Sequence, residues 1–249
     1  MKRFLLLSFA VLSYVISIYG QSVIRYETPK SHFLDEKSLT KSATIISFSL
    51  KNKQAYWVAY SLTKGNTEGG FKRSNKFTPD PEIPKSSQGS NADYSKSGYD
   101  KGHIAPAADM GWSSKTMTES FYFSNMSPQN PSFNRGIWKK LEELVRDWAV
   151  KYGKIYITTG PILDSFIEYI GKGKIGVPAY FYKAILYYNP PKAPKAIAFI
   201  FKNDGSSLPL SHFVVSVDSL EKRTNIDFFY QLPDDVEAKI EAKSIFGDW

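Results

Sequence analysis

Two apolar segments near the start of the chain, 43–50 (ATIISFSL) and 55–62 (AYWVAYSL), are separated by only four polar residues. Both segments are short and rich in β-branched and aromatic residues, which favour extended backbone. Two such segments joined by so short a connection predict an antiparallel β-hairpin. A fold for this chain therefore has to contain at least one antiparallel strand pair.

Other segments extend this pattern into a mixed fold. Further strands are expected over 121–123, 154–159, 180–187, 195–201 and 211–217, and shorter helices over 217–224 and 233–243. One longer helix is expected to begin with Asn134 as its N-cap and to end at Gly153, because apolar residues recur between them at helical spacing. Residues 63–98 and 124–133 are polar and are predicted to form loops. The first loop is long enough to be either functional or disordered.

No internal repeat or linker divides the chain into two cores. The expected architecture is one α+β domain, residues 43–249, with a central and mainly antiparallel sheet flanked by helices, preceded by an extended lead-in over 21–42. The chain has no cysteine, which excludes disulfides, thiolate metal sites and cysteine nucleophiles. A full hydrophobic core must therefore hold the domain together, and the 42% hydrophobic content can supply one.

The first 20 residues have the pattern of a secretory signal peptide. Lys2 and Arg3 precede an apolar run, and Gly20 offers a small residue before a cleavage point at Gln21. The run is short for a membrane span, so a retained anchor is the less favoured alternative. We expect a secreted or periplasmic protein with no stable membrane association after cleavage.

Loss of the signal peptide would lower the formal net charge from +8 by two, to +6. An exported basic protein is attracted to polyanions, among them nucleic acids, anionic glycans and membrane surfaces. Charge alone does not choose among these partners.

The stretch from Tyr99 to Met110 (YDKGHIAPAADM) places one of three histidines directly after a glycine. Histidine can accept a proton near neutral pH, and asparagine can offer a neutral oxygen to a hard cation. His103 and the downstream Asn134 therefore suggest metal-assisted phosphodiester hydrolysis. Taken singly, each residue also has a structural explanation: a loop histidine, a helix N-cap, a solvated helix residue at Glu142 and a surface charge at Arg73.

The spacing of these residues matches a known family. Asp100-Lys101-Gly102-His103-Ile104-Ala105-Pro106 resembles an Asp-Arg-Gly-His signature with its Ala-Pro turn. Asn125-Met126-Ser127-Pro128-Gln129, Asn134-Arg135-Gly136-Ile137-Trp138 and then Glu142 resemble the second signature. The chain is similar to the DNA/RNA non-specific endonucleases, the ββα-metal nuclease group that includes endonuclease G, most specifically over 100–142 and more weakly over 43–233.

The resemblance implies a ββα-metal nuclease fold and a role for each matched residue. It implies His103 as general base, Asn134 as the direct ligand of Mg²⁺ (with Mn²⁺ as an alternative), and Glu142 orienting metal-bound water. It further implies that Asn125 supports the site, that Arg73 contacts the scissile phosphate, and that Lys101 and Arg135 bind substrate. Lys101 stands where the signature has arginine, so a bidentate contact there would be lost.

The leading hypothesis is thus an exported, metal-dependent endonuclease that hydrolyses DNA and RNA to 5′-phosphate products. The resemblance also allows a homodimer. Two alternatives remain open at this point: a non-catalytic protein that binds polyanions on the same scaffold, and a phosphodiesterase with a narrower, toxin-like role.

Overall fold

A computed structural model describes residues 24–243 and 245–249, so the expected signal peptide lies outside the described residues. Seven strands form one sheet in the order β1-β2-β3-β6-β7-β8-β9, and every neighbouring pair is antiparallel. The strands are β1 (Glu36–Thr40), β2 (Ile45–Ser49), β3 (Gln54–Thr63), β6 (Lys154–Ile170), β7 (Ile175–Tyr187), β8 (Lys195–Lys202) and β9 (Val214–Val215). The expected hairpin is the β2–β3 pair.

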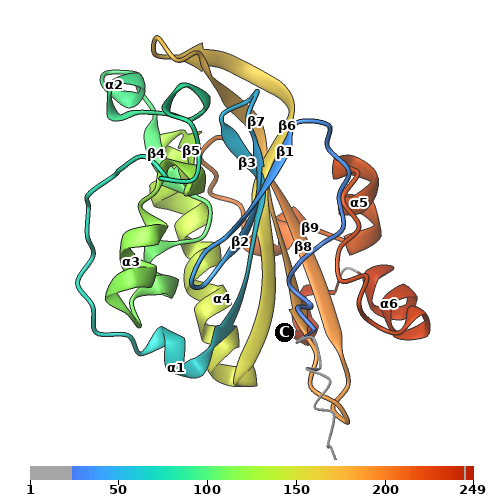
Figure 1. The fold of residues 1–249 in the computed structure, drawn as a ribbon. Helices are drawn as coiled ribbons and strands as arrows, with labels where there is room; N and C mark the ends of the chain where they lie inside the picture. Colours follow the sequence, from blue (N-terminus) through green and yellow to red (C-terminus); the bar gives the residue numbers. More distant parts are fainter. Residues whose placement is uncertain (1–23, 244) are drawn as a thin grey trace, which may run out of the picture.

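The two faces of this sheet carry different elements (Figure 1). On one face pack α4 (Trp138–Tyr152) and α3 (Ser114–Ser120), and on the other pack α5 (Val217–Thr224) and α6 (Asp234–Glu241). Side chains of a strand alternate between faces, so Val58 and Tyr60 of β3 join the core under α4, whereas Trp57 and Ala59 join the core under α5. The sheet is therefore buried on both sides.

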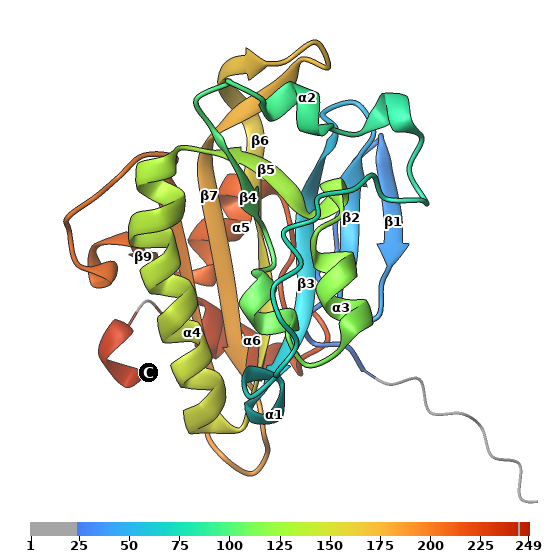
Figure 2. The same cartoon turned by 90° about the vertical axis from the view of Figure 1, so that its left-hand side faces the viewer.

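A separate two-stranded unit lies on the α4 side of the sheet. It consists of β4 (Asp100–His103) and β5 (Met126–Gln129), which pair antiparallel with His103 opposite Met126. Figure 2 shows this pair crossing in front of the large sheet beside α4, with the short helices α1 (Lys64–Thr67) and α2 (Asn91–Tyr94) in the long preceding segment. Two parts of the chain that carry the sequence signatures thus lie side by side.

The long helix differs from its prediction at its start. Residues Phe133–Ile137 form a π-helical turn that is kinked at Gly136, and the regular helix α4 begins only at Trp138. Asn134 is therefore not the N-cap of α4, and its side chain is used elsewhere. The predicted end at Gly153 is confirmed, because Gly153 adopts φ 82°, a left-handed value that glycine accepts without steric penalty.

Other predicted elements need correction. The segment 121–123 is not a strand: Phe121 caps α3, and the strand follows at β5 because Asn125 anchors the chain there. In the segment 211–217 only Val214 and Val215 are strand, because residues 211–213 belong to a 3₁₀ turn and α5 begins at Val217. The lead-in is extended as expected, but its residues 36–40 pair with β2 as β1, so the sheet begins before residue 43. The helix expected over 217–224 has the bounds of α5.

Among the described helices, none combines the length and the apolar character needed to cross a membrane.

Candidate active site

His103 is the last residue of β4 and is only 8% exposed. Its ring contacts the edge of Phe121, with centroids 4.7 Å apart, and approaches Phe77 at 5.7 Å. Its Nε2 atom is buried and has no hydrogen-bond partner among the described residues. Burial first, and the nearby Arg73 guanidinium second, lower the pKa of His103 to about 3. The ring is therefore neutral at pH 7, with a nitrogen free to accept a proton.

Arg73 comes from the long segment between β3 and β4. Its guanidinium lies over the Phe121 ring, 5.1 Å from the centroid, and its Nε donates to Asn75 Oδ1 at 2.8 Å. Arg73 interacts electrostatically with both His103 and Glu142, and its side chain stays exposed. The fold thus brings a cation, a neutral imidazole and a carboxyl group together from three distant parts of the sequence.

Asn134 is oriented by the first residue of β4. Its Nδ2 donates to Asp100 Oδ2 at 2.8 Å, and Asp100 also accepts from Arg135 Nε at 2.8 Å and from Arg135 Nη2 at 2.5 Å. An ionised carboxylate can only accept hydrogen bonds, so Asp100 selects the amide nitrogen of Asn134 and leaves the Oδ1 oxygen facing away as a potential ligand. Hydrogen bonds from these neighbours lower the pKa of Asp100 despite its partial burial, which keeps it ionised.

Arg135, which is predicted to bind substrate, pairs with Asp100 in the structure. Its guanidinium forms a bidentate ion pair with Asp100, although its side chain is 71% exposed. In this arrangement Arg135 fixes Asp100, and through Asp100 it fixes Asn134.

Asn125 acts on the backbone rather than at the reaction centre. Its Oδ1 accepts from Ala105 N at 2.9 Å, and its Nδ2 donates to Ala105 O and Ser120 O, each at 2.9 Å. The side chain is buried, and these three bonds hold the chain directly after His103. Asn125 thus positions the backbone that follows His103.

Gly102 allows β4 to approach β5 closely. A Cβ atom placed on Gly102 would lie 2.2 Å from the side chain of Gln129, a distance that no real contact tolerates. Gln129 is fully buried, and neither of its amide atoms has a partner among the described residues. The glycine before the histidine is therefore required by the packing of the second signature against the first.

Glu142 lies on α4 within a group of charged side chains. Burial raises the pKa of Glu142, and its electrostatic neighbours include Lys183, Asp109 and Arg146. Asp109 accepts from Arg146 Nη1 at 3.1 Å and from the Tyr60 hydroxyl at 2.8 Å, which balances its buried charge. Glu142 therefore interacts electrostatically with charged side chains from α4, from β7 and from the segment that follows β4.

Lys183 of β7 is the least expected member of this group. It is completely buried, its Nζ has no hydrogen-bond partner among the described residues, and it lies 4.9 Å from the centroid of the Trp138 ring. Burial lowers its pKa, and the negative charge of Glu142 opposes that shift. A buried ammonium next to Glu142 favours the ionised carboxylate.

Lys101 remains next to the candidate site. It lies on the same face of β4 as His103, two residues away, and its Nζ is 4.5 Å from the centroid of Phe77 and 3.2 Å from Asn91 Oδ1. It is only partly buried, so its charge remains accessible to a polyanion.

Three residues that contribute to the candidate site were not predicted from the sequence: Asp100, Gln129 and Lys183. Asp100 and Gln129 belong to the matched signatures, but their contacts cannot be read from spacing. Lys183 did carry a signal, because it is a charged residue in the otherwise apolar stretch Tyr180-Phe-Tyr-Lys-Ala-Ile-Leu-Tyr187. Its neighbours Phe181 and Ile185 face the core under α4.

Comparison with known proteins places this geometry in a family. Residues 25–235 match the family model described as DNA/RNA non-specific endonuclease. The chain is 33% identical over 230 residues to nuclease C1 of Cunninghamella echinulata var. echinulata, an alignment that covers 86% of this chain and 89% of the relative. It is 34% identical over 200 residues to the mitochondrial nuclease EXOG of Danio rerio, which covers 74% of this chain and 58% of that longer relative.

The fold agrees with a solved relative. A chain in a crystal structure of the EndoG/EndoGI complex superposes with a TM-score of 0.73 and 31% identity, covering 79% of this chain and 86% of that one. This similarity confirms the expected α+β, ββα-metal nuclease fold. With its family match, its relatives and its fold in agreement, this chain belongs to the DNA/RNA non-specific endonuclease family.

Proposed function

We propose that this protein is an exported, magnesium-dependent endonuclease that hydrolyses DNA and RNA, without preference for the sugar, to products with a 5′-phosphate. The observation that carries the proposal is the buried, neutral His103 next to Arg73, which in turn interacts electrostatically with Glu142. A general base has to be unprotonated and free to accept a proton, and His103 meets both requirements.

In this proposal the neutral imidazole of His103 accepts the proton of the attacking water. Arg73 contacts the phosphate, and this contact has a second effect: a phosphate dianion or diester next to Arg73 offsets the positive charge that lowers the pKa of His103. Substrate binding would thus strengthen the base when it is needed. Burial of the ring against Phe121 and Phe77 limits the motion of Nε2.

The residues present fit a hard divalent cation. Asn134 would hold it through Oδ1, because Asp100 already occupies Nδ2, and Glu142 would orient water next to it. When bound, such an ion neutralises charge on the phosphoryl oxygens and polarises water. We propose Mg²⁺ as that ion, with Mn²⁺ as the alternative that accepts the same oxygen ligands.

Basic residues of the exposed segment that leads to β4, including Lys72, Lys76 and Lys101, would hold the nucleic-acid backbone. Contacts of this kind bind phosphates without reading bases, so binding should weaken as salt concentration rises. Export rests on the sequence pattern of residues 1–20 alone.

The test is an assay of plasmid and RNA cleavage with Mg²⁺ and with excess EDTA. The protein is produced by export from the full chain, and mass spectrometry should identify Gln21 as its first residue. His103→Ala and Asn134→Ala should each lower cleavage by about 100-fold or more at a temperature where both variants remain folded, since a general base contributes roughly 10²–10⁴-fold. His212→Ala, at an exposed histidine, is the matched control.

Three outcomes would contradict parts of the proposal. Full cleavage by His103→Ala or in EDTA would exclude this mechanism. Salt-sensitive binding of DNA without any cleavage by the unsubstituted protein would support the non-catalytic alternative. An intact Met1 in the mature protein would exclude removal of the signal peptide.

A further inference from the structure

A second cluster of polar groups lies on the opposite face of the sheet from His103, between α5 and α6. One carboxylate oxygen from each of Asp218, Glu221 and Glu241 lies within 4.8 Å of the others. Asp218 and Glu221 stand three residues apart on α5, so they share a face of that helix, and Glu241 ends α6. Residues of two helices thus converge on one point.

Glu241 provides an independent sign that this point is built for a ligand. It is 4% exposed, and its Oε1 atom is buried without a hydrogen-bond partner among the described residues. Buried carboxylate oxygens are normally paired, because an unpartnered buried charge is strongly unfavourable. Glu241 therefore requires either a proton or a cation at this position.

The surroundings add negative charge rather than compensate it. Asp227 and Glu237 also act on Glu241, and none of these five carboxylates forms an ion pair within the described part of the chain. This concentration of acid contrasts with the basic net charge of the whole chain.

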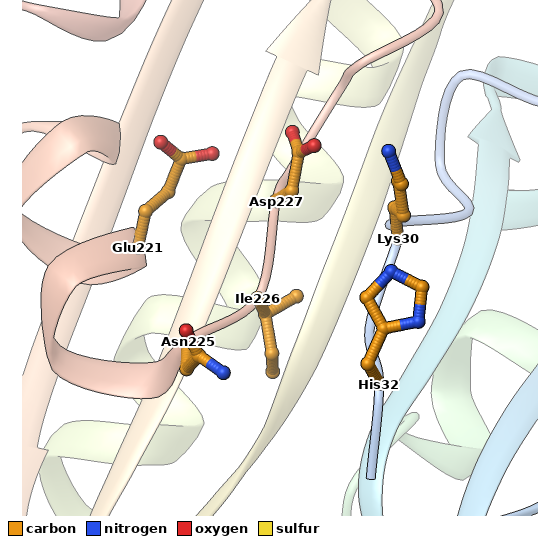
Figure 3. Close-up of a pocket in the computed structure, with 6 residues that line it drawn as sticks. All are labelled: Lys30, His32, Glu221, Asn225, Ile226 and Asp227. Atoms are coloured by element: carbon orange, nitrogen blue, oxygen red, sulfur yellow. The ribbon is translucent and has the colours of Figure 1, made fainter.

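A pocket opens next to the cluster and gives water or an ion access to Glu221 (Figure 3). Glu221 and Asp227 extend their carboxylates into it from α5 and from the segment that follows, and Lys30 and His32 line it from the N-terminal segment. Phe228 N donates to Glu221 Oε1 at 2.8 Å, which fixes the side chain of Glu221. Among the described residues, neither Lys30 nor His32 forms an ion pair with the cluster.

We propose that Asp218, Glu221 and Glu241 hold a calcium ion that fastens α6 to α5. Three carboxylates supply hard oxygen ligands, and water entering from the partly exposed side would complete the coordination shell. Ca²⁺ accepts several carboxylates in a flexible geometry, whereas Mg²⁺ keeps several waters and is usually bound by only one or two carboxylates. Three converging carboxylates therefore favour Ca²⁺.

The experiment measures thermal unfolding of chelator-treated protein with and without Ca²⁺, together with calcium binding by calorimetry. The unsubstituted protein should gain several degrees in Tm and bind one Ca²⁺ at this site. Glu241→Gln and Asp218→Asn should each weaken that binding at least tenfold and lose the Tm gain. Asn134→Ala removes the proposed catalytic ligand, so its Tm gain should be unchanged and the two metal sites are told apart.

Glu241→Gln should fold without calcium, because glutamine has nearly the same shape and carries no charge, and its metal-free Tm should equal or exceed that of the unsubstituted protein. Asp218→Asn repeats the test at a partly exposed position, and Asp147→Asn on α4 is the control that keeps the gain. The proposal is overturned if Ca²⁺ leaves Tm unchanged, if both cluster variants keep the full gain, or if Mg²⁺ gives a larger gain than Ca²⁺.

Discussion

Single side chains at the candidate site depend on their neighbours for their chemical state. Asp100 determines which atom of Asn134 is left to bind a cation, and Arg135 in turn holds Asp100. Arg73 and burial together keep His103 neutral. Each of these effects acts over one contact. Substitution of a supporting residue should therefore change the orientation or the protonation state of the residue that it supports.

The low pKa of His103 predicts an acid sensitivity of folding. The ring resists protonation in the folded protein, but in the unfolded chain it takes up a proton near pH 6.5. The unfolded state therefore binds more protons between about pH 3 and pH 6.5, and this contribution to stability is lost as pH falls through that window. His103→Asn should flatten the dependence of the free energy of unfolding on pH over this range.

The measurement is urea unfolding in EDTA at several pH values between 4 and 7. His212→Asn, at an exposed histidine, should retain the slope of the unsubstituted protein. An equal slope in the His103 variant would mean that this ring is protonated in the folded state as readily as in the unfolded one.

At the scale of elements, the β4–β5 pair positions both signatures. Gly102 of β4 and Gln129 of β5 pack against each other, so the two strands can approach closely. The kinked turn at Phe133–Ile137 then directs Asn134 back toward β4 before α4 becomes regular. Neither element needs a long regular structure to hold its residues in place.

Gly102→Ala should disturb this pair. The added methyl group would meet the side chain of Gln129, and overpacking of a buried contact costs about 1–3 kcal/mol. We expect a loss of stability in that range and a larger relative loss of nuclease activity, because His103 is the next residue. Chemical denaturation and the cleavage assay measure the two effects.

A second substitution tests the cause. Gln129→Ala in the Gly102→Ala background makes room for the methyl group and should recover part of the stability. Gly247→Ala, where an added Cβ meets nothing within 4 Å, should be neutral. A Gly102→Ala protein as stable and active as the unsubstituted one would show that the strands can separate without consequence.

At the scale of the whole molecule, the sheet separates the candidate active site from the acidic cluster. The face under α4 carries the candidate active site, and the face under α5 and α6 carries the acidic cluster. Both faces have a complete apolar core, so stability can be changed on one face while the geometry of the other is kept.

Two matched leucines test this separation. Leu141 of α4 and Leu220 of α5 are both fully buried, and replacing either with alanine should destabilise the protein by about 2–5 kcal/mol. Leu141→Ala should also lower kcat/KM, because Leu141 precedes Glu142. Leu220→Ala should leave kcat/KM unchanged at a temperature where both variants are folded, and an equal loss in both would show that the faces are coupled.

Local sequence predicted the elements whose boundaries depend on short-range chemistry. The β2–β3 hairpin follows from two alternating segments and a short polar turn, and α5 and the end of α4 follow from helical spacing and Gly153. The signatures also identified His103, Asn125, Asn134 and Glu142 as one set of candidates. These features depend on residue type and spacing, which the sequence states directly.

Tertiary structure decided what each of these residues contacts. Residues 36–40 became a strand only because β2 offered an edge, and 121–123 did not, because Phe121 ends α3 and Phe123 begins a 3₁₀ turn. The engagement of Arg135 by Asp100, the burial of Lys183 near Glu142 and the convergence of Glu241 on α5 all join residues far apart in the chain. Spacing cannot report such contacts, because desolvation and charge pairing arise only when the folded chain brings the groups together.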